Sequence, residues 1–251
     1  MIPLPPRYTL FPYTTLFRSK KDVEVFQIAL GMKLEEFDKI FAEWLEKNIF
    51  SKMNVFPSID PKELEDLKDL VQEQPKNENA HLKLAIGYLQ YGKLIDAEIY
   101  ASKILSLSPK NPAVYDILGQ IYYHKKNPDK ARELLEKAAL LGSKNFNSHL
   151  LLGLMYWHHA KNADLAIKAF ETAKNSYPSY VEGNNPYLKL AEIYMSQGKQ
   201  KEAFQELEAY LKFNGTDFKT RLELSKRYFH LKRYDAVRSE ERRVGKECRS
   251  R

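Results

Sequence analysis

The sequence predicts an all-α protein built from repeated pairs of helices. A Leu-small-x-x-Tyr pattern occurs five times, and its tyrosines are separated by 34, 34, 38 and 34 residues. An alanine follows each of the first four tyrosines by nine or ten residues. Apolar residues one helical turn apart lie on the same helix face, and a fixed period of this size is typical of stacked helical repeats.

The repeated positions are predicted to lie where two helices pack. The leucine and the tyrosine of the pattern lie on the first helix of each pair, helix A, and face the second helix. The small residue allows that partner to approach closely, and the alanine does the same from the second helix, helix B. These positions are Leu84, Tyr88 and Ala97; Leu118, Gly119, Tyr122 and Ala131; Leu152, Gly153, Tyr156 and Ala166; and Leu190, Ala191, Tyr194 and Ala203.

This pattern resembles the tetratricopeptide repeat, a helix-turn-helix unit of 34 residues. The resemblance implies a right-handed solenoid over residues 76–237, with four full repeats and one truncated repeat. One isolated repeat cannot bury its apolar face, so neighbours must stack. The extra residues between Tyr156 and Ala166, and around Glu182, are expected in loops.

Residues 51–75 are predicted to form a linker and a helix that caps the first repeat. Asp60 and Pro61 are typical of a helix start, and Pro75 follows the end of the helix. One apolar face is expected from Leu64, Leu67, Leu70 and Val71.

Residues 20–50 are predicted to be the helical remnant of a truncated upstream domain. The segment carries an apolar stripe of Leu34, Phe37, Phe41, Trp44, Leu45 and Ile49. Its string ALGMKLEEFDKIFAEWL is similar to the closing helix of gluzincin-type zinc metallopeptidase domains. That resemblance implies a bacterial parent protein with an upstream peptidase domain.

Both ends of the chain, residues 1–19 and 238–251, resemble translated sequencing-adapter strings. Residues 238–251, taken in order, and residues 19–6, taken in reverse order, can be translated from opposite strands of one DNA sequence. In this correspondence the codon of Gly245 is complementary to that of Pro12, and the codon of Lys246 to that of Phe11. Only Tyr8, opposite Arg249, breaks the match. We therefore expect both ends to be adapter-derived and to take no part in the fold.

This exclusion changes the charge argument. The net charge of +7 falls to +2, because the ends carry eight basic and three acidic residues. A nucleic-acid partner, which a basic chain would favour, is not expected. The one cysteine, Cys248, lies in the C-terminal adapter-like segment, so the rest of the chain has no cysteine. No apolar run approaches the ~18 residues of a membrane span.

Motifs for catalysis are not found in the sequence. A gluzincin needs H-E-x-x-H, which places two imidazoles on zinc, and this motif does not occur. Adjacent histidines such as His158 and His159 diverge on a helix and do not chelate one ion in the usual way. We expect no catalytic residue, no metal and no cofactor in this segment.

The resemblance also implies where a ligand binds, because the family lines its concave groove with helix A. The corresponding positions give the candidate groove residues Gln120, Tyr123, His124, Asn147, Leu150, Leu154, Trp157, His158, Asn185, Leu188 and Glu192. Tyr123 and Trp157 are candidate anchors for a peptide, and contact between successive A helices is the alternative. The cationic clamp of chaperone-binding members is not expected, since Leu82 and Ile86 occupy its positions.

The sequence therefore predicts a non-catalytic scaffold that binds a protein or peptide, as a fragment of a larger bacterial protein. The alternative is the accessory C-terminal repeat region of a gluzincin-type zinc metallopeptidase. A complete H-E-x-x-H helix upstream would decide for the alternative. The compartment, cytoplasmic or exported, is left open.

Overall fold

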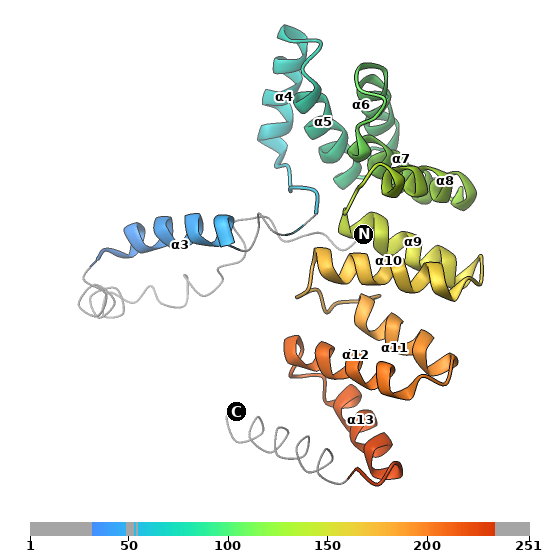
Figure 1. The fold of residues 1–251 in the computed structure, drawn as a ribbon. Coiled ribbons are helices and arrows are strands. Elements are labelled where there is room, and N and C mark those ends of the chain that lie inside the picture. The colour runs from blue at the N-terminus through green and yellow to red at the C-terminus, as the bar shows by residue number, and fades with distance from the viewer. Residues whose placement is uncertain (1–31, 49–52, 54, 234–251) are drawn as a thin grey trace. The chain divides into compact units, whose positions relative to one another are not determined.

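The computed structural model describes residues 32–48, 53 and 55–233 (Figure 1). Both predicted adapter-like ends, residues 20–31 and the second helix of the last repeat lie outside the described residues. Across the described ranges there are eleven α-helices and no strand, which confirms the predicted all-α class. The helices are α3 (Leu34–Asn48), α4 (Pro61–Glu73), α5 (Glu78–Gln90), α6 (Leu94–Leu107), α7 (Pro112–His124), α8 (Pro128–Leu140), α9 (Phe146–His158), α10 (Ala163–Ser176), α11 (Pro186–Ser196), α12 (Gln200–Phe213) and α13 (Phe218–His230).

The chain divides into two compact units, residues 1–152 and 153–251, and the boundary falls within α9. In the first unit, α5 pairs with α6 and α7 with α8, while α4 packs on α5 and α6 on α7. In the second unit, α10 packs on α11, α11 pairs with α12, and α12 contacts α13. From α4 to α8 and from α10 to α13, consecutive helices are therefore neighbours.

Most helices begin at a side chain that caps the first turn. Asn77, Asn111, Asn127, Asn162 and Asn185 each accept a hydrogen bond from a backbone N–H in the first turn that follows. Asp60 and Asp217 do the same for α4 and α13. Such caps satisfy donors that have no partner inside the helix, which explains why the helices start at these residues.

The turns between helices A and B share one backbone conformation. The residue four or five positions after the repeat tyrosine has a positive φ in all five repeats: Gly92 (71°), Lys126 (60°), Lys161 (49°), Gly198 (72°) and Lys232 (57°). Glycine, present at Gly92 and Gly198, reaches this region without strain. Three repeats place lysine there instead.

The small residue after the repeat leucine lies where two helices approach closely. A Cβ atom built on Gly119 would lie 2.5 Å from the Leu135 side chain of α8. In the second unit, a Cβ atom on Gly153 would lie 2.6 Å from the ring of Phe170 on α10. Only glycine fits at these two positions without displacing the partner, which gives the physical reason for the pattern.

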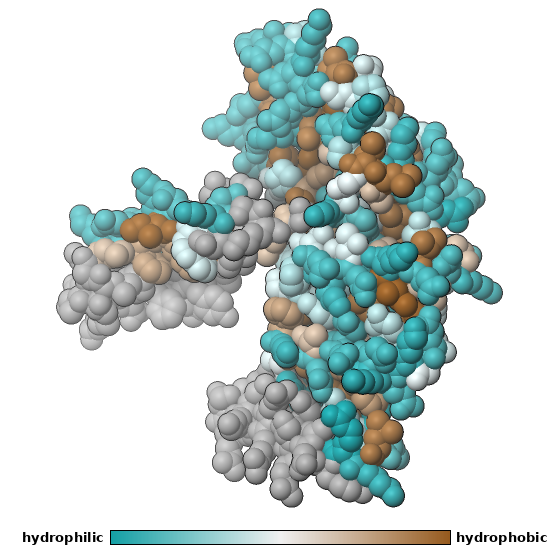
Figure 2. All heavy atoms as spheres, viewed as in Figure 1, coloured by the Kyte–Doolittle hydropathy of each residue, from teal (hydrophilic) through white to brown (hydrophobic). Residues whose placement is uncertain are grey.

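Each unit has its own apolar core. The face of the described residues seen in Figure 2 is largely hydrophilic. Repeat positions supply much of these cores, since the repeat leucines and the alanines of helix B are all buried. In the second unit the ring of Tyr228 packs edge-on against Phe204, with centroids 5.2 Å apart. The residues that recur in the sequence are thus those that fill the cores.

The two insertions fall in loops, as expected from the sequence. The α9–α10 turn spans four residues, against three in the α5–α6, α7–α8 and α11–α12 turns, and the α10–α11 loop spans residues 177–185. On α3, the rings of Phe37 and Phe41 stack with centroids 5.5 Å apart.

None of the described helices is both long and apolar enough to cross a membrane.

Candidate peptide-binding surface

The candidate groove residues of α7 in the first unit differ in exposure. Gln120 is buried and its Nε2 donates to Ser148 Oγ at 3.4 Å. Tyr123 is exposed, and its ring meets the edge of the His124 ring with centroids 5.8 Å apart. Partial burial lowers the pKa of His124, which favours the neutral imidazole. On α9, Asn147 and Leu150 are half-buried.

Beside Gln120 lies a buried polar cluster around Asp116. Asp116 is 2% exposed, and its Oδ2 accepts a hydrogen bond from Ser143 Oγ at 2.6 Å. Its Oδ1 atom is buried without a hydrogen-bond partner. Burial raises the pKa of this carboxyl, while the hydroxyls of Ser143 and Ser148 and the nearby His149 act in the opposite direction.

In the second unit, two candidate residues from successive A helices are bonded to each other. The indole N–H of Trp157 on α9 donates to Oε1 of Glu192 on α11 at 3.2 Å. Lys189 pairs with the other carboxylate oxygen at 3.0 Å. Burial alone would raise the pKa of Glu192, but the hydrogen bonds from Lys189 and Trp157 lower it, so the carboxyl is ionised.

The other candidates of the second unit lie around this pair in different ways. Leu154 and Leu188 are half-buried, and His158 is exposed. Asn185 is 1% exposed, where its side chain accepts from Leu188 N at 3.0 Å and donates to Val181 O at 3.3 Å. Its amide is therefore used to cap α11 and to hold the preceding loop. The repeat position of Asn185 did not predict this capping role.

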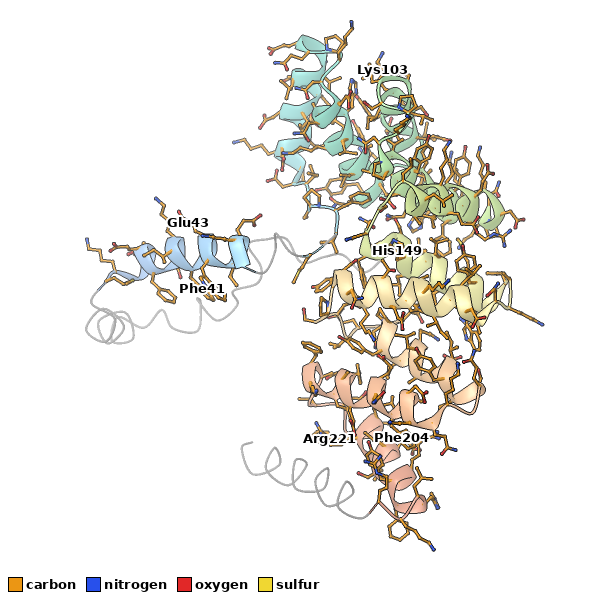
Figure 3. The ribbon with its side chains drawn as sticks, viewed as in Figure 1. Phe41, Glu43, Lys103, His149, Phe204 and Arg221 are labelled. Carbon is orange, nitrogen blue, oxygen red and sulfur yellow. The ribbon has the colours of Figure 1, made fainter. Side chains whose placement is uncertain are left out.

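A polar contact that the repeat pattern did not include recurs at an equivalent position of helix A in all five repeats. In each repeat the side chain three residues before the repeat leucine bonds to a backbone carbonyl of the preceding loop (Figure 3 labels His149 and Arg221). We call these contacts the loop locks. They run from His81 to Pro75 O (2.9 Å), Tyr115 to Pro109 O (2.7 Å), His149 to Ser143 O (2.8 Å), Tyr187 to Pro178 O (2.7 Å) and Arg221 to Gly215 O (2.9 Å).

The loop locks persist at two places where the repeats differ in sequence. Ser143 stands where three other locks use a proline carbonyl, of Pro75, Pro109 and Pro178, and its own carbonyl accepts the bond from His149. The three inserted residues lengthen the lock of Tyr187 to nine residues, while the other four each span six. A signal was present in the sequence, because a hydrogen-bond donor with a large side chain occupies this position in every repeat.

Within the described ranges, no group of three or more histidine, cysteine, aspartate or glutamate side chains lies where a metal ion could be held. The surface therefore offers hydrogen bonds, one ionised carboxylate and apolar contact.

Residues 118–181 and 185–217 match models of the tetratricopeptide repeat. These residues are tetratricopeptide repeats. The fold is similar to that of YrrB, a tetratricopeptide-repeat protein, with 16% identity and a TM-score of 0.56 over 72% of this chain and 91% of YrrB. It is also similar to a MamA structure (AMB-1), with 18% identity and a TM-score of 0.50 over 67% of this chain and 97% of MamA. No curated protein sequence matches the chain.

The predicted fold class, a solenoid of tetratricopeptide repeats, is therefore confirmed by the helices and by these similar structures.

Proposed function

We propose that these tetratricopeptide repeats are a non-catalytic scaffold that binds a protein or peptide, and that Trp157 and Glu192 belong to the contact surface. The observation that carries the proposal is the hydrogen bond between these two side chains. It joins an aromatic ring and an ionised carboxylate from two successive A helices into one small surface.

The chemistry of this pair suits recognition. Large amphipathic rings carry much of the energy in protein interfaces, because they bury apolar area while keeping a polar group satisfied. Glu192 keeps 49% of its side chain exposed, so a ligand can reach it. The exposed His158 adds a polar neighbour.

The family supports the same class of function. YrrB, which shares the fold, is described as a tetratricopeptide-repeat protein with an unusual peptide-binding site. Tetratricopeptide arrays present extended surfaces to their partners rather than enclosed catalytic pockets. We therefore propose a peptide or a protein segment as the ligand.

The test is selection of a phage-displayed random peptide library on the full chain, followed by affinity measurements on the selected peptides. We expect Trp157→Ala to weaken binding at least tenfold, about 1.4 kcal/mol, because the anchor ring is lost. Trp44→Phe is the matched control, since Trp44 is the other tryptophan and lies on α3 outside the repeats.

Thermal unfolding of the same variants separates binding from stability. If Trp157→Ala lowers the melting temperature substantially while selected peptides bind as before, Trp157 only packs between A helices. The proposed contact surface is then wrong. Selection of no peptide at all by the folded chain would count against the peptide-binding function itself.

A further inference from the structure

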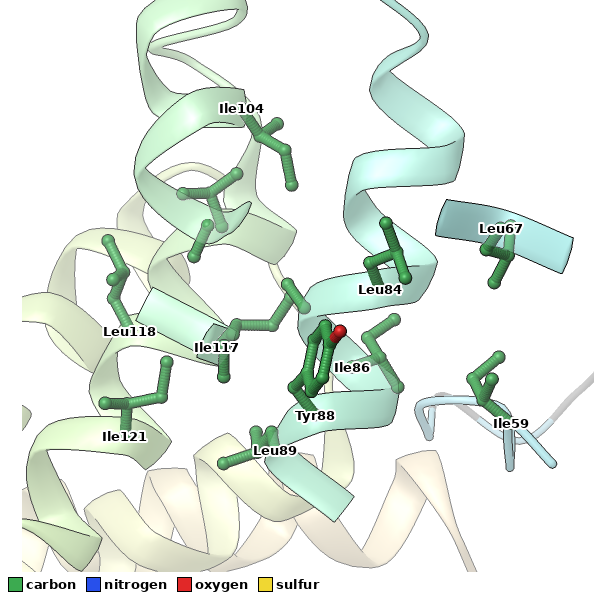
Figure 4. Close-up of a cluster of buried hydrophobic side chains, with 14 of the residues drawn as sticks. Ile59, Leu67, Leu84, Ile86, Tyr88, Leu89, Ile104, Ile117, Leu118 and Ile121 are labelled. Atoms are coloured by element: carbon green, nitrogen blue, oxygen red, sulfur yellow. The ribbon is translucent and has the colours of Figure 1, made fainter. Parts of the chain in front are cut away.

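Residues 56–59, Phe-Pro-Ser-Ile, lie against α5 without regular secondary structure, and we call them the strap. Within the strap only Ile59 is fully buried, with 2% of its surface exposed. Phe56, Pro57 and Ser58 are half-buried. Figure 4 places Ile59 in the same apolar cluster as Ile86 and Leu67.

The strap is held through its backbone by two neighbouring side chains at the end of α5. The carboxamide of Gln90 uses both of its polar atoms: Oε1 accepts from Ile59 N at 3.0 Å and Nε2 donates to Pro57 O at 2.6 Å. The Tyr91 hydroxyl donates to Ile59 O at 2.9 Å.

These three backbone groups lie along one edge of the strap. In an extended chain, the carbonyl of one residue and both polar groups of the residue two positions later point to the same side. Gln90 and Tyr91 therefore contact Pro57 and Ile59 much as a neighbouring β-strand would, although they belong to a helix. Recognition through the main chain does not depend on the sequence of the bound segment.

A missing side chain on α5 makes room for the apolar part of the strap. A Cβ atom built on Gly87 would lie 3.3 Å from Ile59 Cγ2 and 2.6 Å from Leu64 Cδ1. The bare backbone at Gly87 is therefore covered by Ile59 and Leu64 together. An aliphatic side chain at the Ile59 position fills this space.

We propose that Gly87, Gln90 and Tyr91 form a binding site for an extended peptide carrying an aliphatic residue, and that the strap occupies this site in cis. The site selects an extended backbone edge through Gln90 and Tyr91, and an aliphatic side chain through Gly87. It belongs to the first repeat and shares no residue with the surface around Trp157. Failure of one proposal therefore leaves the other standing.

A resident segment masks such a site, because a tethered ligand competes at a high effective concentration. The probe is a fluorescent synthetic peptide of residues 55–60, Val-Phe-Pro-Ser-Ile-Asp, measured by anisotropy against the full chain. We expect the variant Ile59→Ser, which weakens the cis occupant, to bind the probe at least tenfold more tightly than the original chain. Adding Gln90→Ala to that variant is expected to abolish binding.

The matched control is Gln197→Ala in the Ile59→Ser background, since Gln197 is an exposed glutamine at the end of α11. It should leave probe binding unchanged. The proposal is overturned if Ile59→Ser is folded by circular dichroism and does not bind the probe. It is equally overturned if binding survives the loss of Gln90.

A second measurement covers the case in which Ile59→Ser does not fold. In the unaltered chain, we expect the Ile59 amide to exchange with deuterium at least tenfold faster than the Leu84 amide in the core of α5. We expect Gln90→Ala to accelerate exchange at Ile59 at least tenfold and to leave Leu84 unchanged. Exchange of both amides at one common rate means that the strap opens only when the repeat unfolds, and the proposal is then wrong.

Discussion

Asp116 is a carboxyl group buried in a repeat interface without a full set of partners. Its Oδ1 atom has no hydrogen bond, and burial raises its pKa. A raised pKa means that the folded state holds the proton more tightly than the unfolded state. The resulting stabilisation is present below the unfolded pKa, about 3.9, and is lost as the pH rises through the folded pKa.

We therefore expect Asp116→Asn to stabilise the chain at neutral pH by on the order of 1 kcal/mol, because it removes the desolvation cost of a buried carboxyl whose Oδ1 atom has no hydrogen bond. The amide oxygen still accepts the bond from Ser143. Urea unfolding at neutral pH and near pH 4 is the measurement, and the gain should shrink at the lower pH. A variant that is less stable than the original at neutral pH would show that the carboxylate has a partner that matters more than its desolvation.

At the same scale, the sequence could predict which residues recur but not every role they take. Asn185 was assigned to the groove from its repeat position, and the structure places it in a cap on α11. An asparagine before Pro-x-x is a capping signal in itself, and the repeat register obscured that signal. The bond between Trp157 and Glu192 could not be predicted, because it depends on rotamers of two side chains 35 residues apart.

The turns between helices A and B differ in chemistry between repeats, because either glycine or lysine takes their positive-φ position. Lys126 has a φ of 60°, in the left-handed region where a side chain is strained, and its side chain is exposed. We expect Lys126→Gly to raise the free energy of unfolding by roughly 0.5–1 kcal/mol, because the strain is relieved at no cost in packing. Urea unfolding followed by circular dichroism measures the change.

Gly92→Ala is the reciprocal control for this turn. Gly92 has a φ of 71°, and a Cβ atom there would meet nothing within 4 Å. Alanine at this position should therefore destabilise the chain through backbone conformation alone, by a similar amount. If both variants leave stability unchanged, these turns do not hold the strained conformation in solution.

Helices themselves could be predicted well from the sequence, because their signals are local: an apolar period, a cap and a breaking residue. The packing of the strap on α5 could not, since Ile59 and Gln90 are 31 residues apart and the contact is made to a backbone. The composition of the segment before Pro61 is typical of a linker, and it gave no indication that this segment packs against α5.

Across the part of the chain that the structure describes, the loop locks are a polar contact that all five repeats share. Tyr115 and Tyr187 supply two of them from buried rings, one in each unit, and each hydroxyl donates at 2.7 Å. Replacement by phenylalanine keeps the ring and removes the donor. Each single variant should therefore lose only its hydrogen bond, about 1 kcal/mol.

The double variant Tyr115→Phe with Tyr187→Phe tests whether these bonds act independently. The two hydroxyls share no partner, so we expect their losses to add to about 2 kcal/mol in urea unfolding. Tyr123→Phe is the control, because Tyr123 is exposed and lies outside the loop locks. A double variant no less stable than either single one would mean that one lock already opens when the other is lost. In that case the stability of each repeat depends on its contacts with neighbouring helices rather than on its own loop lock.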